Sequence, residues 1–153
     1  KRRLRALCAE APPNGVGASE DQQAEVEKAA SELEPYCPSA PARGSLEGTW
    51  DLLYCTAPGG SSGKVGPFVG QVSQTFLDEE RFKNEVELFG ALKISLQAVR
   101  EVLDDVRIRV TFRELVFSLF GTEVFRKEAK GSGVWKQRFV DADLRVMDTP
   151  SLF

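Results

Sequence analysis

The chain has 153 residues, the usual size of one domain, and its 42% of hydrophobic residues predict that most of it folds around one core. A net charge of −3 argues against general nucleic-acid binding, which requires a basic surface. The chain has no histidine and only three cysteines, so it lacks Ser-His-Asp and Cys-His machinery and the usual zinc ligands. We therefore expect no catalytic residues, no metal site and no obligatory cofactor. Carboxylate or lysine chemistry remains an alternative.

Residues 1–45 are expected to form helices followed by a linker. Lys1–Leu7 is basic and has a helical pattern. Ser19 and Gln22 have the spacing of a capping box, and apolar residues at helical spacing follow, which predicts a helix over Ser19–Leu33. Glu34–Ser45 is rich in proline, and we place the domain boundary after it, giving a helical segment 1–45 and a second unit 46–153.

From Leu46 onward the apolar residues recur with the period of two that is typical of strands. Eight strands are expected, over Gly48–Thr56, Val69–Leu77, Arg81–Gly90, Leu92–Val99, Val106–Phe112, Leu115–Phe120, Val134–Val140 and Leu144–Met147. No helix is expected between them. This succession predicts a mainly β protein with an up-and-down antiparallel β-barrel of about eight strands.

The residues expected to face the inside of this barrel are mostly apolar, and they are candidates for lining a ligand site. They are Phe82, Val86, Ile108, Val110, Phe112, Phe117, Trp135 and Phe139. The pattern leaves open whether they enclose a cavity or pack as an ordinary core. Asn84 and Gln137 are polar residues in phase with them. We expect these amides to bond one another, a backbone group or a polar atom of a ligand, because an unpaired buried amide is costly.

Most charged residues are expected on the surface or in turns. Arg107, Arg109 and Arg113 form a basic row, near Arg100, that could contact an anionic lipid head group or a protein partner. A solvated strand face is the alternative that we favour. The acidic pairs and triplets of the chain lie at expected turns, where burial is too slight to shift their pKa values for acid–base chemistry.

Several stretches resemble the plastid lipid-associated proteins (PAP), also called fibrillins. The resemblance is carried by SELEPYCPSAPARGSLEGTW, GTWDLLYCTAPG, GQVSQTFLDEERFKNEVEL and VWKQRFVDADLRVMDTPSLF. The chain departs from the family's commonest form at Cys55, where a threonine usually stands, and at Phe139-Val140, where Tyr-Leu is frequent. A further C-terminal strand usually follows the segment that ends at Phe153. The resemblance implies a lipocalin-like fold, a place at plastoglobules or thylakoids, and lipid or isoprenoid binding.

Three residues gain an expected role from this resemblance. Gly48-x-Trp50 is similar to the pattern that opens the first strand of lipocalins, with glycine permitting close backbone approach and the indole closing one barrel end. Contact between Trp50 and a ligand is the alternative. Arg145 resembles the cation that covers this tryptophan. It is out of phase with Leu144 and Val146, which indicates a position outside the lumen. A solvated strand arginine is the alternative.

The preferred interpretation is a non-catalytic chloroplast protein that binds an apolar lipid or isoprenoid, such as a quinone or carotenoid, at the thylakoid membrane or plastoglobule. The alternative is a structural subunit or assembly factor docked on a large thylakoid complex. A large void inside the barrel would favour the first interpretation. A filled lumen with an apolar patch outside would favour the second.

Overall fold

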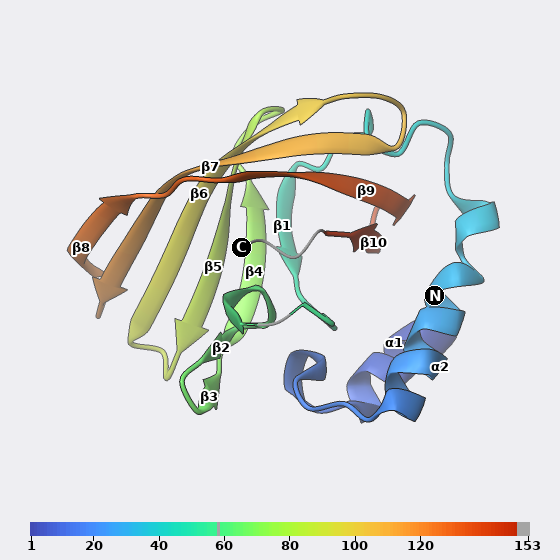
Figure 1. Cartoon of the computed structure of the whole chain (residues 1–153), viewed down its shortest axis with the longest axis horizontal. Coiled ribbons are helices and arrows are strands. Elements are labelled where there is room, and N and C mark those ends of the chain that lie inside the picture. The colour runs from blue at the N-terminus through green and yellow to red at the C-terminus, as the bar shows by residue number, and fades with distance from the viewer. Residues whose placement is uncertain (58, 150–153) are drawn as a thin grey trace.

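The computed structural model describes residues 1–57 and 59–149, and it shows two helices followed by a curled antiparallel sheet (Figure 1). Helix α1 spans Arg2–Glu10 and α2 spans Glu20–Ser31. Ser19 caps α2 as expected: its side chain accepts from the Gln22 N–H, and the Gln22 side chain accepts from the Ser19 N–H. Short 3-10 segments cover Pro13–Gly15 and Glu34–Tyr36. In the described part of the chain, no helix has the length and apolar character needed to cross a membrane.

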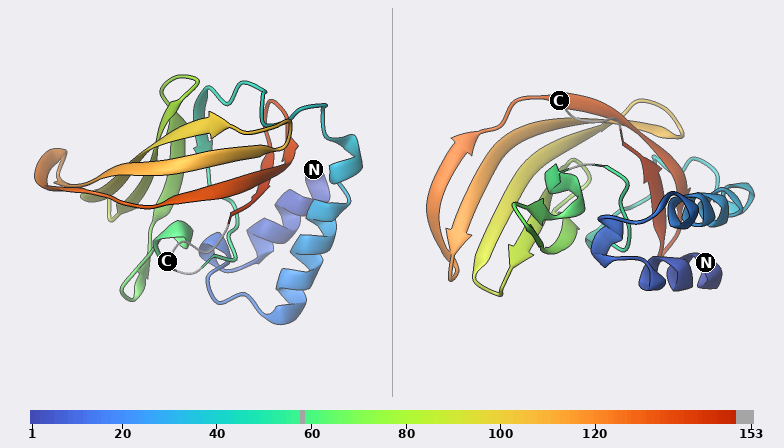
Figure 2. Two further views of the ribbon diagram at one scale, coloured as in Figure 1. Left: turned by 45° about the horizontal axis from the view of Figure 1, so that its top comes forward. Right: turned by 60° about the horizontal axis from the view of Figure 1, so that its bottom comes forward.

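The main sheet has eight antiparallel strands in the order β1-β4-β5-β6-β7-β9-β10, with β8 also paired to β7. Their bounds are Gly48–Asp51 (β1), Gln71–Phe76 (β4), Arg81–Leu88 (β5), Leu92–Val102 (β6), Arg107–Leu119 (β7), Thr122–Glu128 (β8), Ser132–Val140 (β9) and Arg145–Asp148 (β10). A small hairpin, β2 (Lys64–Val65) with β3 (Phe68–Val69), follows a 3-10 turn at Gly59–Ser62. Within the described residues β1 and β10 do not pair, so the sheet is a curled half-barrel (Figure 2).

The mainly β class is confirmed, but two strand assignments were wrong. Val106–Phe112 and Leu115–Phe120 belong to the single strand β7, in which a bulge at Arg113 shifts the alternation between its two halves. β8 was missed. All seven of its residues are exposed, so burial imposes no alternation on its sequence.

The buried residues form two cores. The first, here called the concave core, contains Ala42, Leu46, Phe76, Phe82, Ala98, Ile108, Val110, Phe112, Trp135 and Val140. The second, called the helix-side core, contains Leu4, Val26, Ala29, Ala30, Phe139 and Leu144. Figures 1 and 2 show the two helices beside β9 and β10, which contribute to both cores. Residues from the linker, Ala42 and Leu46, are fully buried in the concave core, so the linker also closes one end of the sheet.

Phe139 was expected in the lumen, and the structure places it in the helix-side core instead. The cause is a bulge in β9. Val146 pairs with Phe139 and Met147 pairs with Gln137, so Arg138 is an extra residue that reverses the alternation. Trp135 and Val140 therefore face the concave core, whereas Phe139 faces the helices.

Candidate ligand-binding site on the concave face

The closed end of the concave face is packed. Phe76, Phe82, Ala98 and Phe112 pair in register across β4, β5, β6 and β7, and all four are buried. The rings of Phe76 and Phe82 stack at 5.2 Å between centroids, and Trp135 meets Phe82 edge-on at 5.9 Å. Ile108 and Val110 are fully buried. The predicted lining residues among them lie together and fill this end as a core; they are Phe82, Ile108, Val110, Phe112 and Trp135.

The other end of the concave face carries an apolar row that remains partly open. Its members pair in register across five strands and are Val72, Val86, Ile94, Phe117 and Phe125. Val86 is buried, Phe117 is partly exposed, and Phe125 at the rim is 53% exposed. The Phe117 and Phe125 rings lie 5.8 Å apart. We call this set the open row. Val86 and Phe117 were predicted lining residues, whereas the other three were not singled out.

A chain of polar side chains begins between the packed end and the open row, at Asn84 and Gln74 on β5 and β4, and continues to β10 and β9. The Asn84 Oδ1 accepts from Gln74 Nε2 at 2.6 Å, and Gln74 Oε1 accepts from Arg145 Nη1. Arg145 Nε then donates to Gln137 Oε1 at 2.8 Å. We call this chain the polar belt. Asn84 and Gln137 were expected to bond one another or a backbone group, but in the structure they bond the side chains of Gln74 and Arg145, which join them.

Arg145 lies inside the half-barrel, which corrects two expectations about it. It was expected outside the lumen and over Trp50, whereas its guanidinium lies 5.3 Å from the ring centre of Phe76. The β9 bulge and the helix-side core explain the error, because Leu144 and Val146 pack toward the helices and leave Arg145 facing inward. Alternation indicates which residues share a face but cannot say which face a helix covers.

A second arginine, Arg100, lies on the same face. It was grouped with the external basic row, but it is only 8% exposed and lies 5.5 Å from the Phe76 ring centre. Its Nε donates to the Glu79 carbonyl oxygen at 2.5 Å. Burial, and secondarily the charge of Arg100, lowers the pKa of Arg145 to about 9, and burial lowers the pKa of Arg100 as well. Among the described residues, neither arginine has an ion-pair partner.

Four buried donor atoms around this pair have no hydrogen-bond partner in the described residues. They are Arg100 Nη1, Trp135 Nε1, Gln137 Nε2 and Arg145 Nη2. Trp135 is 4% exposed and Gln137 is 1% exposed. Most buried polar atoms in proteins are paired, so a cluster of unpaired donors marks a place where an acceptor belongs.

Trp50 and Gly48 have structural roles, but not for the reasons expected from the sequence. Trp50 packs partly buried against the concave core, and its Nε1 donates to the Leu46 carbonyl oxygen at 3.0 Å. The indole therefore ties the linker to β1. Gly48 is required by its φ of +100°, which disfavours other residues. A Cβ there would meet nothing within 4 Å, so close backbone approach was the wrong reason.

The external basic row is partly neutralised. Arg107 pairs with Asp104 at 2.6 Å and Arg109 with Glu101 at 2.9 Å, both on the protein surface. Arg113 is exposed and has no ion-pair partner among residues 1–57 and 59–149. Exposed pairs of this kind contribute little to stability. The row remains a candidate contact for a head group or a partner.

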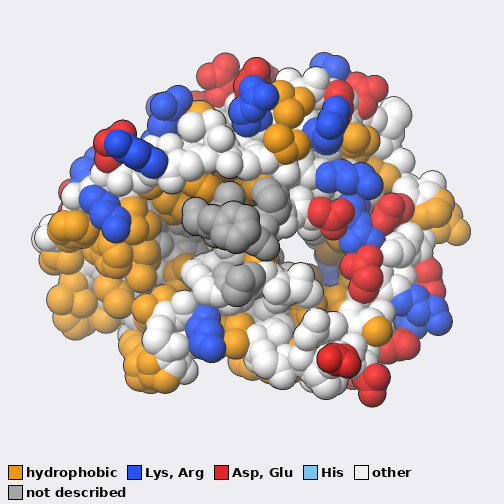
Figure 3. Space-filling model, viewed as in Figure 1, with side chains coloured by type: hydrophobic (Ala, Val, Ile, Leu, Met, Phe, Trp, Pro, Cys, Tyr) orange, Lys and Arg blue, Asp and Glu red, His pale blue; other side chains and the backbone are white. Residues whose placement is uncertain are grey.

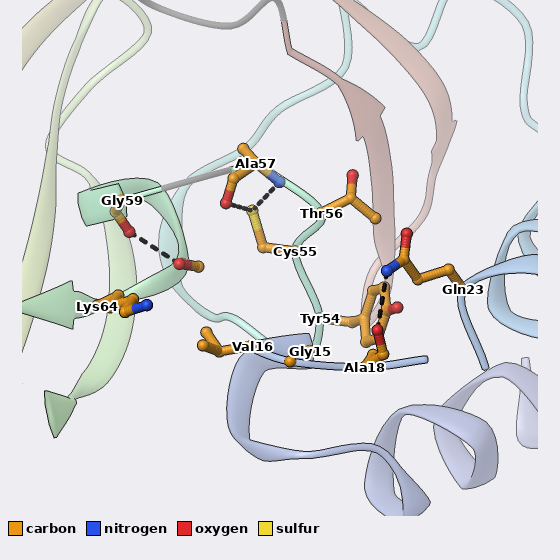
Figure 4. Close-up of a pocket in the computed structure, with 12 residues that line it drawn as sticks. Gly15, Val16, Ala18, Gln23, Tyr54, Cys55, Thr56, Ala57, Gly59 and Lys64 are labelled. Carbon is orange, nitrogen blue, oxygen red and sulfur yellow. Dashed lines mark hydrogen bonds between the residues drawn. The ribbon is translucent and has the colours of Figure 1, made fainter. Parts of the chain in front are cut away.

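A hollow of about 260 Å³ lies elsewhere, between the segment before α2 and the connection from β1 to β2 (Figure 4). Tyr54 and Cys55 line it, and Tyr54 Oη is buried without a partner in the described residues. The ring of Tyr54 lies so close to Gly15 that a Cβ there would come within 2.7 Å of it. In the described part of the chain, no three Cys, Asp or Glu side chains gather in a way that could hold a metal ion.

A model of the PAP/fibrillin family matches residues 1–137 of the chain. The chain belongs to the PAP/fibrillin family. Its members are plastid-associated in general, and the family is generally one of non-catalytic structural proteins. The match ends at Gln137, so β10 and Arg145 lie beyond it. No curated protein and no solved structure matches the chain.

Proposed function

We propose that this fibrillin-family protein binds an amphipathic lipid or isoprenoid, such as a quinone or carotenoid, without catalysing a reaction, at the thylakoid membrane or plastoglobule. The open row would hold the apolar tail and the polar belt would meet the polar end. The packed closed end leaves the open row as the part of the concave face able to receive a tail. Ligand sites are typically apolar with a few polar groups placed to orient the ligand.

The observation that carries this proposal is the registered row of five apolar residues. Four inter-strand spacings of about 4.8 Å make the row about 19 Å long, comparable with an extended acyl or isoprenoid tail. The row ends at Val72, and Gln74 of the polar belt is the next inward residue on the same strand. A tail on the row would therefore bring its polar end to the belt.

Titration with a prenylated quinone and with a hydroxylated carotenoid would test the proposal, with the fluorescence of Trp50 and Trp135 as the signal. We expect saturable quenching in the wild type. Ile94→Lys places a charge in the open row and should weaken binding at least about tenfold. Ser95→Lys is the matched control, because Ser95 points to the opposite face, where its hydroxyl bonds Glu85. Equal binding by the two variants, or no saturable response in the wild type, would contradict the proposal.

A second candidate function, a non-catalytic subunit docked on a thylakoid protein complex, is favoured by apolar tips at one end of the sheet. Phe89 is 76% exposed and Phe120 is 81% exposed. The two turns touch, since the Phe120 N–H donates to the Ala91 carbonyl oxygen at 2.8 Å, and Phe68 packs edge-on against Phe89 at 4.9 Å. Figure 3 shows apolar side chains gathered on the side of the molecule that carries β8 and the β2–β3 hairpin.

The backbone of these tips supports a role beyond folding. Phe89 and Phe120 have φ of +56° and +47°, and each precedes a glycine of positive φ. The turn from β7 to β8 has two residues, Phe120-Gly121, and the turn from β5 to β6 has three, residues 89–91. Positive φ at these positions favours Asn-Gly, because phenylalanine is strained there. Phe89→Asn with Phe120→Asn should keep the fold. If the tips dock the protein, this variant should stop migrating with large solubilised thylakoid complexes on native gels, whereas Val134→Asn on β9 should still migrate with them. Unchanged migration would remove this candidate.

A further inference from the structure

We propose that the polar end of the bound lipid is a carboxylate, held by Arg145 together with Gln137 and Trp135 on the concave face. The proposal rests on the lipid-binding function above and specifies its ligand as an acidic lipid instead of a neutral quinone or carotenoid.

The first observation is that neither buried arginine forms an ion pair within the described residues; the charge of Glu79 acts on Arg100 but only from a distance, and Arg145 has no such neighbour. Arg145 and Arg100 both lie against the Phe76 ring, at 5.3 and 5.5 Å from its centre. Among residues 1–57 and 59–149, the hydrogen-bond acceptors of these two side chains are neutral: amide oxygens of Gln74 and Gln137, and a backbone carbonyl. A buried cation without an anion is costly, and contact with an aromatic ring offsets only part of that cost. A bound anion would supply the missing charge.

The second observation is that the unpartnered atoms are all donors. Arg145 Nη2, Gln137 Nε2 and Trp135 Nε1 are buried and lack an acceptor in the described residues, as does Arg100 Nη1. In the part of the chain that the structure describes, no buried side-chain acceptor around them is left unpaired. An ionised carboxylate only accepts hydrogen bonds and fits a guanidinium in both shape and charge. A hydroxyl or quinone oxygen could accept one bond but would leave the charge uncompensated.

The third observation fixes where the tail would go. Arg145 reaches Gln74 on β4, and Val72 at the end of the open row is the next inward residue of that strand. The carboxylate and the tail would therefore lie on one continuous surface. Phe76, Phe82 and Trp135 pack closely beside these donors, so a carboxylate would fit there more easily than a larger phosphate.

Comparison of oleate with methyl oleate tests the inference, because the two share a tail and differ in charge. We expect the wild type to bind oleate roughly 10- to 100-fold more tightly, the range for hydrogen bonds to charged groups. Arg145→Met should bind both lipids with the affinity that the wild type has for the ester. Arg81→Met is the matched control, since Arg81 is an exposed arginine paired with Asp78 in a turn, and it should keep the wild-type preference.

The outcomes separate the two proposals. Equal binding of acid and ester by the wild type, or binding of neither, would overturn the carboxylate site. Lipid binding itself would be overturned only if the quinone and carotenoid titrations also gave no saturable response. If Arg145→Met does not fold, the wild type alone decides through ¹³C NMR of carboxyl-labelled oleate. The bound carboxyl should remain ionised well below its ordinary pKa of about 4 to 5. Titration of the bound carboxyl at or above that value would overturn the inference.

Discussion

Two arginines on neighbouring strands show how differently the two faces of β9 and β10 are built. Arg138 faces the helices, and its guanidinium pairs with Glu27 at 2.7 Å, Glu34 at 2.6 Å and Asp148 at 3.2 Å. Hydrogen bonding to Glu27 raises the pKa of Arg138. Arg145 faces the concave core with two amide partners and, among residues 1–57 and 59–149, no carboxylate partner, and burial lowers its pKa to about 9.

The helix side is built to stabilise the fold, whereas the concave side holds a buried cation and hydrogen-bond donors that lack partners in the described residues. On the helix side, carboxylates from α2 and from the linker surround the cation, so the ion pairs bind the N-terminal segment to the sheet. On the concave side, charge and donors are left over. Proteins break the rules of polar pairing chiefly at functional sites, and for this reason we place the proposed lipid site on the concave face of the half-barrel.

The largest expected effect comes from the two cores beneath these faces. Phe82→Ala and Phe139→Ala each empty a site that is at most 4% exposed, so each should lower the free energy of unfolding by about 3–5 kcal/mol in urea titrations. Phe82→Ala should also shift the emission of Trp135, its ring neighbour. Phe139→Ala should instead expose α1 and α2 to trypsin under native conditions. If both variants changed the Trp135 emission and the trypsin cleavage in the same way, the two cores would be a single cooperative unit.

Replacing Arg138 or Arg145 with methionine should lower the free energy of unfolding by different amounts. Arg138→Met removes three ion pairs from a side chain that is 10% exposed and should cost about 1–3 kcal/mol in urea unfolding. Arg145→Met removes a buried charge that lacks a counter-charge, and this gain should offset the lost bonds to Gln74 and Gln137 to within about 1 kcal/mol. A loss for Arg145→Met as large as that for Arg138→Met would show that the concave arginine is structural.

The structure could be predicted from the sequence where the pattern of apolar residues is uninterrupted or where the residues involved are close together in the chain. The strand over Arg81–Leu88 alternates without interruption, so Phe82, Asn84 and Val86 were placed on the correct face. The cap of α2 could be predicted because Ser19 and Gln22 suffice to form it. In both cases, neighbours in the chain determine the result.

What could not be predicted depends on register and on which face another element covers. The bulges at Arg113 and Arg138 shift the alternation within β7 and β9, and neither leaves a mark in the local pattern. Arg145 was misplaced for this reason. The roles of Gln74 and Arg100 could not be predicted, because they come from partners outside their own strands. The open row is visible only once five strands are aligned.

The loss of stability at low pH should also differ between the Arg138 and Arg145 variants, although by less than the differences above. Hydrogen bonding to Arg138 holds the pKa of Glu27 below its ordinary 4.5. The folded state therefore binds this proton less readily than the unfolded state, so the stabilisation is complete above pH 4.5 and is lost as the pH falls through the lowered value. Urea unfolding at pH 7 and pH 3 should show a smaller acid loss in Arg138→Met than in the wild type. Arg145→Met should keep the wild-type loss, and a reduced loss there would reveal a carboxylate beside Arg145.

The smallest effect is expected at an arginine that belongs to neither face. Arg81 pairs with Asp78 at 2.6 Å across a turn, but its side chain is 68% exposed. Water screens such a pair, so Arg81→Met should change the free energy of unfolding by less than about 0.5 kcal/mol. The Arg81 ion pair is as short as the shortest one that Arg138 makes. It should nevertheless contribute little to stability, because Arg81 is exposed and pairs with only one carboxylate. A loss above about 1 kcal/mol in urea unfolding would mean that ion-pair distance alone sets the contribution. The distinction drawn between Arg138 and Arg145 would then need another basis.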